Sequence, residues 1–232
     1  MIDAVAPEKL PESLSSLRLK LSAFHPRDAA MLAKQAGTYS IAKFTLGIPL
    51  PYSTTEAKNW ISGLAEKKAA GTEHIYALHL VSNPPAAEAM LNNTRAGGNI
   101  AKKSMVNHAL SGKPRLIGAI SLSIESEHRR IEIGYWLGEA FRGSGYAQEA
   151  LMRLLPELFN AGFNRIYALC FPGNSDSMRL LCSLNFIREG RLRQHIVKWN
   201  EASDVICFGL TAARFYRKIK ALKAQAARAQ RL

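Results

Sequence analysis

The sequence predicts a single domain built on a mixed α/β sheet. Two strand patterns, 116–124 and 130–137, are joined by a polar turn and indicate an antiparallel hairpin. After Gly134 the patterns alternate strand, helix, strand, helix, strand, which requires at least one parallel strand pair. A chain of 232 residues with 47% hydrophobic content is large enough to bury one core.

The first part of the chain reads as strand, helix, helix, strand. Residues 17–21 alternate with period two and predict the first strand, and a turn at 25–28 leads into an Ala- and Leu-rich helix. Ser53 is followed three residues later by a glutamate, the spacing of a capping box, so we expect a second helix to run to about Ala70. A strand should follow over 75–81.

The remaining pattern begins with a break in composition. Residues 82–114 are rich in Asn, Pro, Ala, Gly, Lys and Ser without a sustained period, and we interpret them as an inserted surface excursion. Beyond the hairpin, 144–161 has an apolar stripe typical of a helix, which Pro156 should weaken or kink. The later elements expected are a strand at 165–171, a helix at 174–184 and strands from Phe186 and at 205–210.

The cysteines and the apolar runs exclude several classes of protein. No apolar run approaches the roughly 20 residues that span a bilayer, and the N-terminus lacks a secretory signal pattern, so we expect a cytoplasmic protein without a membrane span. The three cysteines are an odd number without close-pair spacing, so we expect neither a disulfide framework nor a metal site.

Basic residues concentrate at the C-terminal end. The formal net charge is +13, and no acidic residue follows Arg214. We interpret 214–232 as a basic tail. A solvated helix is the reading we favour, and the alternative is a surface for ribosomal RNA, an acidic membrane or a partner protein. The charges concerned are Arg214, Arg217, Lys218, Lys220, Lys223, Arg228 and Arg231.

A glycine-rich turn stands where a strand gives way to a helix. The first N–H groups of that helix lack internal partners and point outward with the positive end of the helix dipole. Gly143 and Gly145 allow a ligand to approach the backbone closely, and Arg142 adds a charged donor. By itself the turn predicts either an anion site or a glycine-capped helix start without a ligand. It fits neither the dinucleotide fingerprint nor the P-loop.

Four segments in order carry a family resemblance. They are Glu-Ile-Gly-Tyr-Trp-Leu at 132–137, Arg-Gly-Ser-Gly-Tyr-Ala-Gln-Glu-Ala at 142–150, Asn-Ser-Asp-Ser at 174–177 and Leu-Asn-Phe at 184–186. Together they resemble the GNAT superfamily, specifically its RimJ/RimL-like branch, which acetylates N-terminal amines of ribosomal proteins. The resemblance implies a GNAT fold: a mixed, mostly antiparallel sheet with helices on both faces and a splayed central parallel strand pair that admits the pantetheine arm of acetyl-CoA.

The resemblance also implies how acetyl-CoA, the co-substrate, would be held. Backbone groups of two strand residues would bind the pantetheine and polarise the thioester carbonyl, the turn at 142–147 would hold the pyrophosphate, and an asparagine would contact the pantetheine arm. The residues so assigned are Trp136, Leu137, Arg142, Gly143, Ser144, Gly145, Tyr146, Ala147 and Asn174.

Amine acetylation also needs a proton acceptor and a donor to the leaving thiolate. Glu132 matches the strand position from which some GNAT enzymes draw a general base; the alternative is a solvated carboxylate facing Arg129 or Arg130. The tyrosine that many family members place seven residues after the asparagine is Leu181 here. Ser177 is therefore the candidate donor to the sulfur, with a helix-capping hydroxyl as the alternative.

The segment that follows the predicted helix at 174–184 often lines the acceptor pocket in the RimJ/RimL-like branch. It contains Arg191, Arg193, His195 and Trp199, for which ordinary surface and core roles are the alternatives. Asn185 stands where the family has a glycine, and asparagine tolerates the left-handed backbone conformation required there.

These observations predict an N-terminal extension over 1–16, a GNAT domain over 17–213 and the basic tail. An α-amine, with a pKa of about 7.7–8.0, is partly neutral in the cell and needs only a modest base, unlike lysine at about 10.4. We therefore expect acetyl transfer, by direct attack in a ternary complex, to a protein N-terminal α-amine of ribosomal-protein type. Polyamines, aminoglycosides, amino acids and a non-catalytic CoA- or RNA-binding role stay open, as does a monomer or a homodimer.

Overall fold

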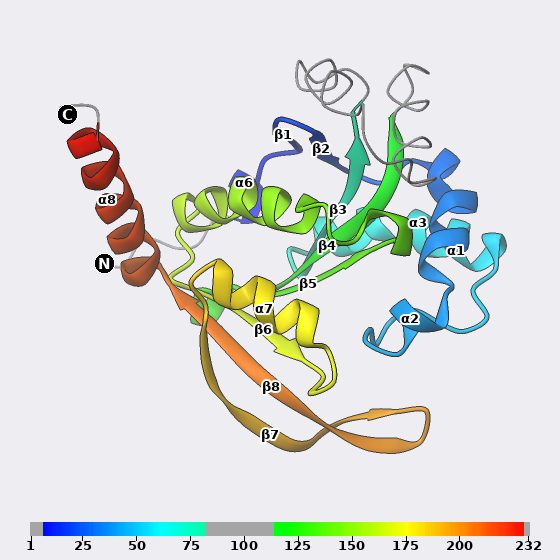
Figure 1. Ribbon diagram of the computed structural model, residues 1–232. Coiled ribbons are helices and arrows are strands. Elements are labelled where there is room, and N and C mark those ends of the chain that lie inside the picture. Colours follow the sequence, from blue (N-terminus) through cyan, green and yellow to red (C-terminus); the bar gives the residue numbers. More distant parts are fainter. Residues whose placement is uncertain (1–6, 82–113, 230–232) are drawn as a thin grey trace, which may run out of the picture.

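The computed structural model describes residues 7–81 and 114–229. An eight-stranded sheet crosses the molecule in the order β1-β2-β3-β4-β5-β6-β8-β7 (Figure 1). Every neighbouring pair is antiparallel except β5 and β6. The predicted mixed, mostly antiparallel sheet with a parallel pair is confirmed. Apart from its last residue, the predicted insertion over 82–114 lies outside the described residues.

The elements up to β3 follow the predicted order with additions. β1 pairs with β2 and brings part of the segment 1–16, which the sequence set apart as an extension, into the sheet. β1 was not predicted, because its three residues are too few for an alternating apolar pattern to be recognised in the sequence. The short helix α2 was not predicted either. The bounds are η1 Pro7–Lys9, β1 Ser13–Ser15, β2 Leu19–Ser22, η2 Pro26–Asp28, α1 Ala29–Ala36, α2 Tyr39–Ala42, α3 Thr54–Ala69 and β3 Glu73–Leu80.

The start of α3 follows directly from its sequence. The Ser53 side chain accepts a hydrogen bond from the Glu56 amide at 3.1 Å, and the Glu56 carboxylate accepts one from the Ser53 amide at 2.7 Å. This reciprocal pair satisfies two amide groups that a helix start otherwise leaves unpaired. The predicted capping box is confirmed.

The second part of the chain contains the predicted hairpin, β4 with β5, and long strands at its end. Pro156 lies inside α6 without ending it. β8 is longer than the predicted 205–210, and with β7 it forms a hairpin that projects from the sheet (Figure 1). The bounds are β4 Arg115–Glu125, η3 Ser126–His128, β5 Arg130–Leu137, η4 Glu139–Phe141, α6 Tyr146–Asn160, β6 Arg165–Cys170, α7 Ser175–Ser183, β7 Ile187–Lys198, β8 Glu201–Thr211 and α8 Ala212–Ala229.

Two apolar clusters hold helices against opposite faces of the sheet. One packs α6 and α7 on strand residues such as Ile133 and Ile166. The other packs α1 and α3 on Ala77 and Leu116. Because strand side chains alternate between faces, Ile131 and Ile133 point toward α6 while Glu132 points to the opposite face. The predicted placement of helices on both faces is confirmed.

The parallel pair is short, and this shapes the site. β5 and β6 pair at only three positions, the last joining Glu132 to Tyr167. Beyond them β5 stays paired with β4 to Leu137, while β6 stays paired with β8 to Cys170. Each strand is therefore held by its outer neighbour while the two separate from each other. This is the splayed pair that the family resemblance implied.

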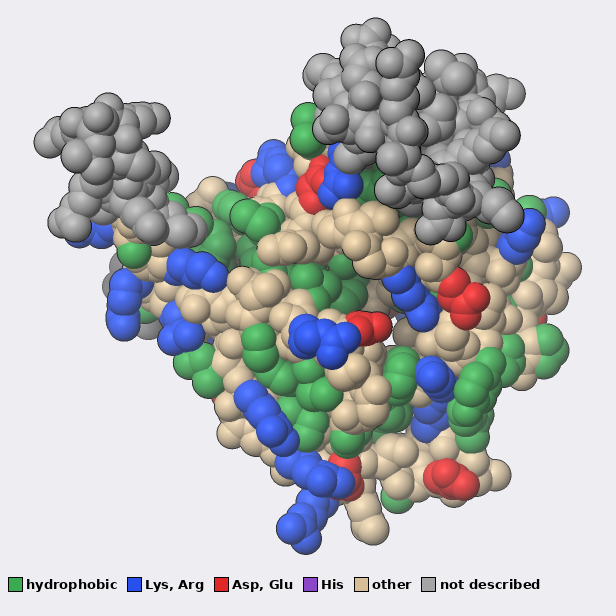
Figure 2. Space-filling model, in the orientation of Figure 1, with side chains coloured by type: hydrophobic (Ala, Val, Ile, Leu, Met, Phe, Trp, Pro, Cys, Tyr) green, Lys and Arg blue, Asp and Glu red, His purple; other side chains and the backbone are tan. Residues whose placement is uncertain are grey.

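The basic tail is a helix that begins directly after β8. Arg214 donates to the Asn185 carbonyl at 2.9 Å and to its side-chain oxygen at 3.0 Å, and Lys218 donates to the Ser183 carbonyl at 3.2 Å. Asn185 has the expected left-handed conformation, with φ 73°. Part of the tail charge therefore anchors α8 to the end of α7. Figure 2 shows further basic side chains on this face of the molecule. Contact with RNA, an acidic membrane or a partner protein stays an untested alternative to the solvated helix.

Candidate active site

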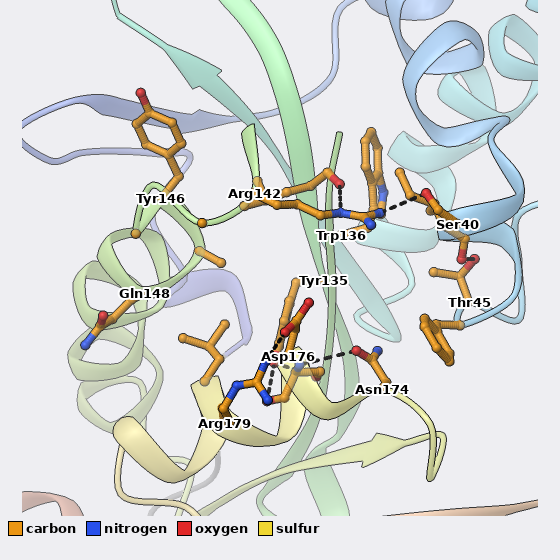
Figure 3. A pocket seen from close by; sticks show the side chains of 18 residues that line it. Ser40, Thr45, Tyr135, Trp136, Arg142, Tyr146, Gln148, Asn174, Asp176 and Arg179 are labelled. Atoms are coloured by element: carbon orange, nitrogen blue, oxygen red, sulfur yellow. Dashed lines mark hydrogen bonds and ion pairs between the residues drawn. The ribbon is translucent and has the colours of Figure 1, made fainter. Parts of the chain in front are cut away.

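A cavity of about 380 Å³ lies where β5 and β6 separate. The surface is hollowed there between α7 and α2 (Figure 2), and the end of β5 and the starts of α6 and α7 supply the other walls (Figure 3). Nine residues proposed from the sequence line it: Trp136, Leu137, Arg142, Gly143, Gly145, Tyr146, Ala147, Asn174 and Ser177. Ser144 and Glu132 are not among the lining residues. Segments far apart in sequence thus meet in one cavity.

The glycine turn presents an uncapped helix start to this cavity. Gly143 and Gly145 have φ values of 74° and 78°, which side-chain-bearing residues rarely adopt. Gly145 is the N-cap of α6 and offers no side chain to the first amide groups of the helix. Those N–H groups remain available, with the positive end of the helix dipole, for an anionic group.

Arg142 joins the turn to two other walls. Its Nε donates to the Leu137 carbonyl and its Nη2 to the Ser40 hydroxyl of α2, each at 3.2 Å (Figure 3). These bonds use two of the five N–H donors of the guanidinium. The arginine therefore holds the rim together and keeps donors for a ligand.

The turn rests on an ion pair that the sequence analysis missed. Arg18 donates through its backbone N and its Nε to the Glu149 carboxylate, at 2.7 and 2.6 Å, and Ser16 donates to the same carboxylate at 2.7 Å. Arg18 Nη1 also donates to the Ser144 carbonyl at 3.0 Å, and its guanidinium lies 4.4 Å from the Tyr146 ring centre. Arg18 and Glu149 are both about four-fifths buried, with side-chain exposures of 21% and 17%. The ion pair therefore fixes the position of the turn through the contacts of Arg18 with Ser144 and Tyr146.

The side chain that caps the start of α7 is Asn174 and not Ser177. The Asn174 side-chain oxygen accepts from the Ser177 amide at 3.2 Å, so Asn174 caps α7. The Ser177 hydroxyl instead contacts the Tyr135 hydroxyl at 2.8 Å and Cys170 Sγ at 3.2 Å. Leu181 is fully buried and offers no polar group. The capping alternative for Ser177 is therefore wrong, and Tyr135 is an additional cavity residue.

Glu132 lies on the sheet face away from α6, and neither expected arginine pairs with it. Arg130 forms two hydrogen bonds with Glu125, at 2.9 and 2.6 Å, and Arg129 donates to the Gly162 carbonyl. Burial raises the pKa of Glu132 above its ordinary value. The alternative of a solvated carboxylate facing these arginines is wrong.

Acidic residues of β7 and β8 are paired with arginines. Glu189 pairs with Arg165, and Asp204 pairs with Arg191 at 2.6 Å. Within the described ranges, no arginine or lysine forms an ion pair with Glu132. It therefore combines burial, a raised pKa and the lack of an arginine or lysine partner.

The β7–β8 hairpin carries the predicted acceptor-segment residues. A positive charge on His195 lowers the pKa of Glu132, an effect smaller than the rise that burial causes. Trp199 stacks on Tyr39 of α2 with ring centres 5.9 Å apart, and Lys198 donates to the Thr45 carbonyl at 2.5 Å. The hairpin end thus contacts the α2 wall of the cavity, while Arg191 is engaged with Asp204.

Comparison with known proteins identifies the family. Residues 18–187 match the acetyltransferase (GNAT) domain. The chain belongs to the GNAT acetyltransferase family. It is therefore an acetyl-CoA-dependent acyltransferase by class. The cavity fits that substrate, because an uncapped helix start and a rim arginine face a space opened by diverging strands.

Two curated relatives and one solved structure are similar to the GNAT protein. An uncharacterized N-acetyltransferase of Bacillus licheniformis is 34% identical over 123 residues, 52% of this chain and 67% of the relative. The ribosomal-protein-serine acetyltransferase of Escherichia coli is 37% identical over 81 residues, 34% of this chain and 45% of the relative. Mycobacterium smegmatis RimJ, solved in complex with CoA-disulfide, aligns with TM-score 0.69 at 20% identity, covering 92% of this chain and 96% of RimJ, which shows the shared fold.

No helix within 7–81 and 114–229 is long and apolar enough to cross a membrane. In the same ranges no three His, Cys, Asp or Glu side chains cluster in a way that could hold a metal ion.

We predict that Arg18→Ala weakens acetyl-CoA binding about tenfold with little change in kcat, because the turn loses its brace rather than a group at the reacting atoms. Calorimetric titration and steady-state kinetics measure the two effects. Arg153→Ala is the matched control, since Arg153 also pairs with a glutamate of α6 but lies away from the turn. Equal losses of affinity in both variants would show that Arg18 has no specific role.

Proposed function

We propose that this GNAT protein transfers the acetyl group of acetyl-CoA to a protein N-terminal α-amine, by direct attack in a ternary complex. One observation carries the proposal. Glu132 is a half-buried carboxylate without an arginine partner, at the last paired position before β5 and β6 separate. A thioester placed in the gap between the strands would be open to an acceptor from that side.

The acceptor class follows from the strength of base available. An amine must be neutral to attack, and an α-amine with a pKa of about 7.7–8.0 is already partly neutral. One carboxylate whose pKa is raised by burial can accept the remaining proton. A lysine amine at about 10.4 would require a stronger base or a second group. The site therefore favours an α-amine.

Groups in the cavity walls would bind the thioester and the rest of acetyl-CoA. The backbone N–H groups of Trp136 and Gly138 face β4, where Gly138 donates to the Ile117 carbonyl at 2.9 Å. The intervening N–H of Leu137 lies on the side that β6 has left, and it could polarise the thioester carbonyl. The turn at 143–147 would hold the pyrophosphate, and Ser177 would face the leaving sulfur. In this arrangement the phosphates and the acceptor lie on opposite sides of the reacting carbon.

The names of relatives support a ribosomal-protein acceptor of the RimJ/RimL type. The E. coli relative is called a ribosomal-protein-serine acetyltransferase, and the M. smegmatis structure is a RimJ. The sequence match covers only 45% of the first, and the second is 20% identical, so the acceptor is inferred jointly from these names and from the base.

An acceptor screen tests this directly. We expect release of free CoA with peptides that carry a free N-terminus, and mass spectrometry should place the acetyl group on the α-amine. The matched control is the same peptide with a blocked N-terminus and one lysine, which should react far more slowly because its amine is charged. Transfer only to lysine, to a polyamine or to an aminoglycoside would contradict the proposal, and binding of acetyl-CoA without any turnover would indicate a non-catalytic module.

We predict that Glu132→Gln lowers turnover by about 100-fold or more, the usual contribution of a general base. In the wild type, kcat should fall as pH drops through the pKa of Glu132, which burial holds above its ordinary value, because a protonated carboxyl cannot accept the amine proton. The variant should lose this acidic limb while binding acetyl-CoA normally. Glu189→Gln should retain it, since Glu189 is already paired with Arg165. Unchanged turnover in Glu132→Gln would remove the assignment.

A further inference from the structure

The Ser177 hydroxyl lies between the two strands that separate at the cavity. Tyr135 comes from β5 and places its hydroxyl 2.8 Å from Ser177 Oγ. Cys170 ends β6, is 4% exposed and has its Sγ 3.2 Å from the same oxygen. Tyr135 and Ser177 line the cavity. A residue in the first turn of α7 thus contacts a side chain of each separated strand.

The direction of these two contacts decides whether the hydrogen of Ser177 is free to face the cavity. A serine hydroxyl has one hydrogen and two acceptor sites. Burial raises the pKa of the Tyr135 phenol, which therefore keeps its proton and can donate it to Ser177 Oγ. The other contact of that phenol, to the Ser177 carbonyl, is longer at 3.4 Å.

Cys170 is positioned to fill the second acceptor site of Ser177 Oγ. Burial raises the pKa of its thiol, so the group stays S–H, a weak donor and a weak acceptor. When both neighbours donate to Ser177 Oγ, the hydrogen of the serine is left without a partner among these contacts. That hydrogen can point into the cavity.

We propose that Tyr135 is a positioning residue that orients the Ser177 hydroxyl to donate a hydrogen bond to the sulfur leaving as CoA. This inference rests on the proposed acetyl transfer. Tyr135 on β5 acts through Ser177 on α7 and so supports the leaving group. Position 181 cannot give this support, because it holds a buried leucine. Ser177 also lies in the first turn of α7, where the helix dipole favours a developing negative charge.

The amine nitrogen bonds to the carbonyl carbon and gives its proton to Glu132. The C–S bond then breaks and its electron pair stays on the sulfur. Ser177 donates a hydrogen bond to that thiolate, which takes up a proton from water after release. Tyr135 loses no proton in this sequence.

The test needs no acceptor and no turnover. The affinities of CoA and of desulfo-CoA, which lacks the thiol, are measured by calorimetry across a pH series. If the wild type stabilises the thiolate, CoA should gain affinity over desulfo-CoA as pH rises toward and beyond the pKa of the thiol. Tyr135→Phe and Ser177→Ala should each reduce that gain by about tenfold, the size of a hydrogen bond to a charged group. The double variant should lose no more than Ser177→Ala alone.

Tyr76→Phe is the matched control. It removes another buried tyrosine hydroxyl, the donor to the Pro11 carbonyl at 2.7 Å, away from the cavity, and should leave the gain unchanged. If Tyr135→Phe shows the same pH-dependent gain of CoA over desulfo-CoA as the wild type, the role of Tyr135 is overturned. If the wild type itself shows no such gain, the whole proposal is overturned. A wrong acceptor class would change neither result, so the two proposals fail separately.

Discussion

The early separation of β5 from β6 is the constraint on which the rest of this structure depends. The two strands pair at three positions and then follow different neighbours, β5 with β4 and β6 with β8. A continuous sheet would have no room at this point. The separation gives the cavity its place, exposes the end of β5 and brings the starts of α6 and α7 to face each other across it (Figure 3).

The chemistry divides between the two faces of the sheet at this opening. On the α6 side, two glycines with positive φ leave a helix start uncapped, which suits the phosphates of an acyl-CoA. On the opposite side, arginines pair with the carboxylates Glu125 and Glu189, but not with Glu132. This arrangement supports a reaction in which the donor and the acceptor approach from different sides, with the proton acceptor on the acceptor side.

Features encoded by neighbouring residues were predictable from the sequence. The capping box at Ser53, the β4–β5 hairpin and the glycine turn depend on residues a few positions apart, and the structure contains all three. The supports of the site were not predictable in this way. Arg18 contacts Glu149 across 131 positions, and Tyr135 contacts Ser177 across 42. The segments that carry the family resemblance contain Tyr135, Glu149 and Ser177 but not Arg18, and only tertiary packing brings the partners together.

The central claim is that the opening between β5 and β6 is where acetyl-CoA binds. Titration of the isotope-labelled protein with CoA, followed by amide resonances in nuclear magnetic resonance, measures this most directly. We expect saturable shifts at Gly143 to Ala147 and at Tyr135 to Leu137, and little change along the exposed middle of β7. Saturable shifts confined to other parts of the chain, or no saturable shifts, would contradict the account.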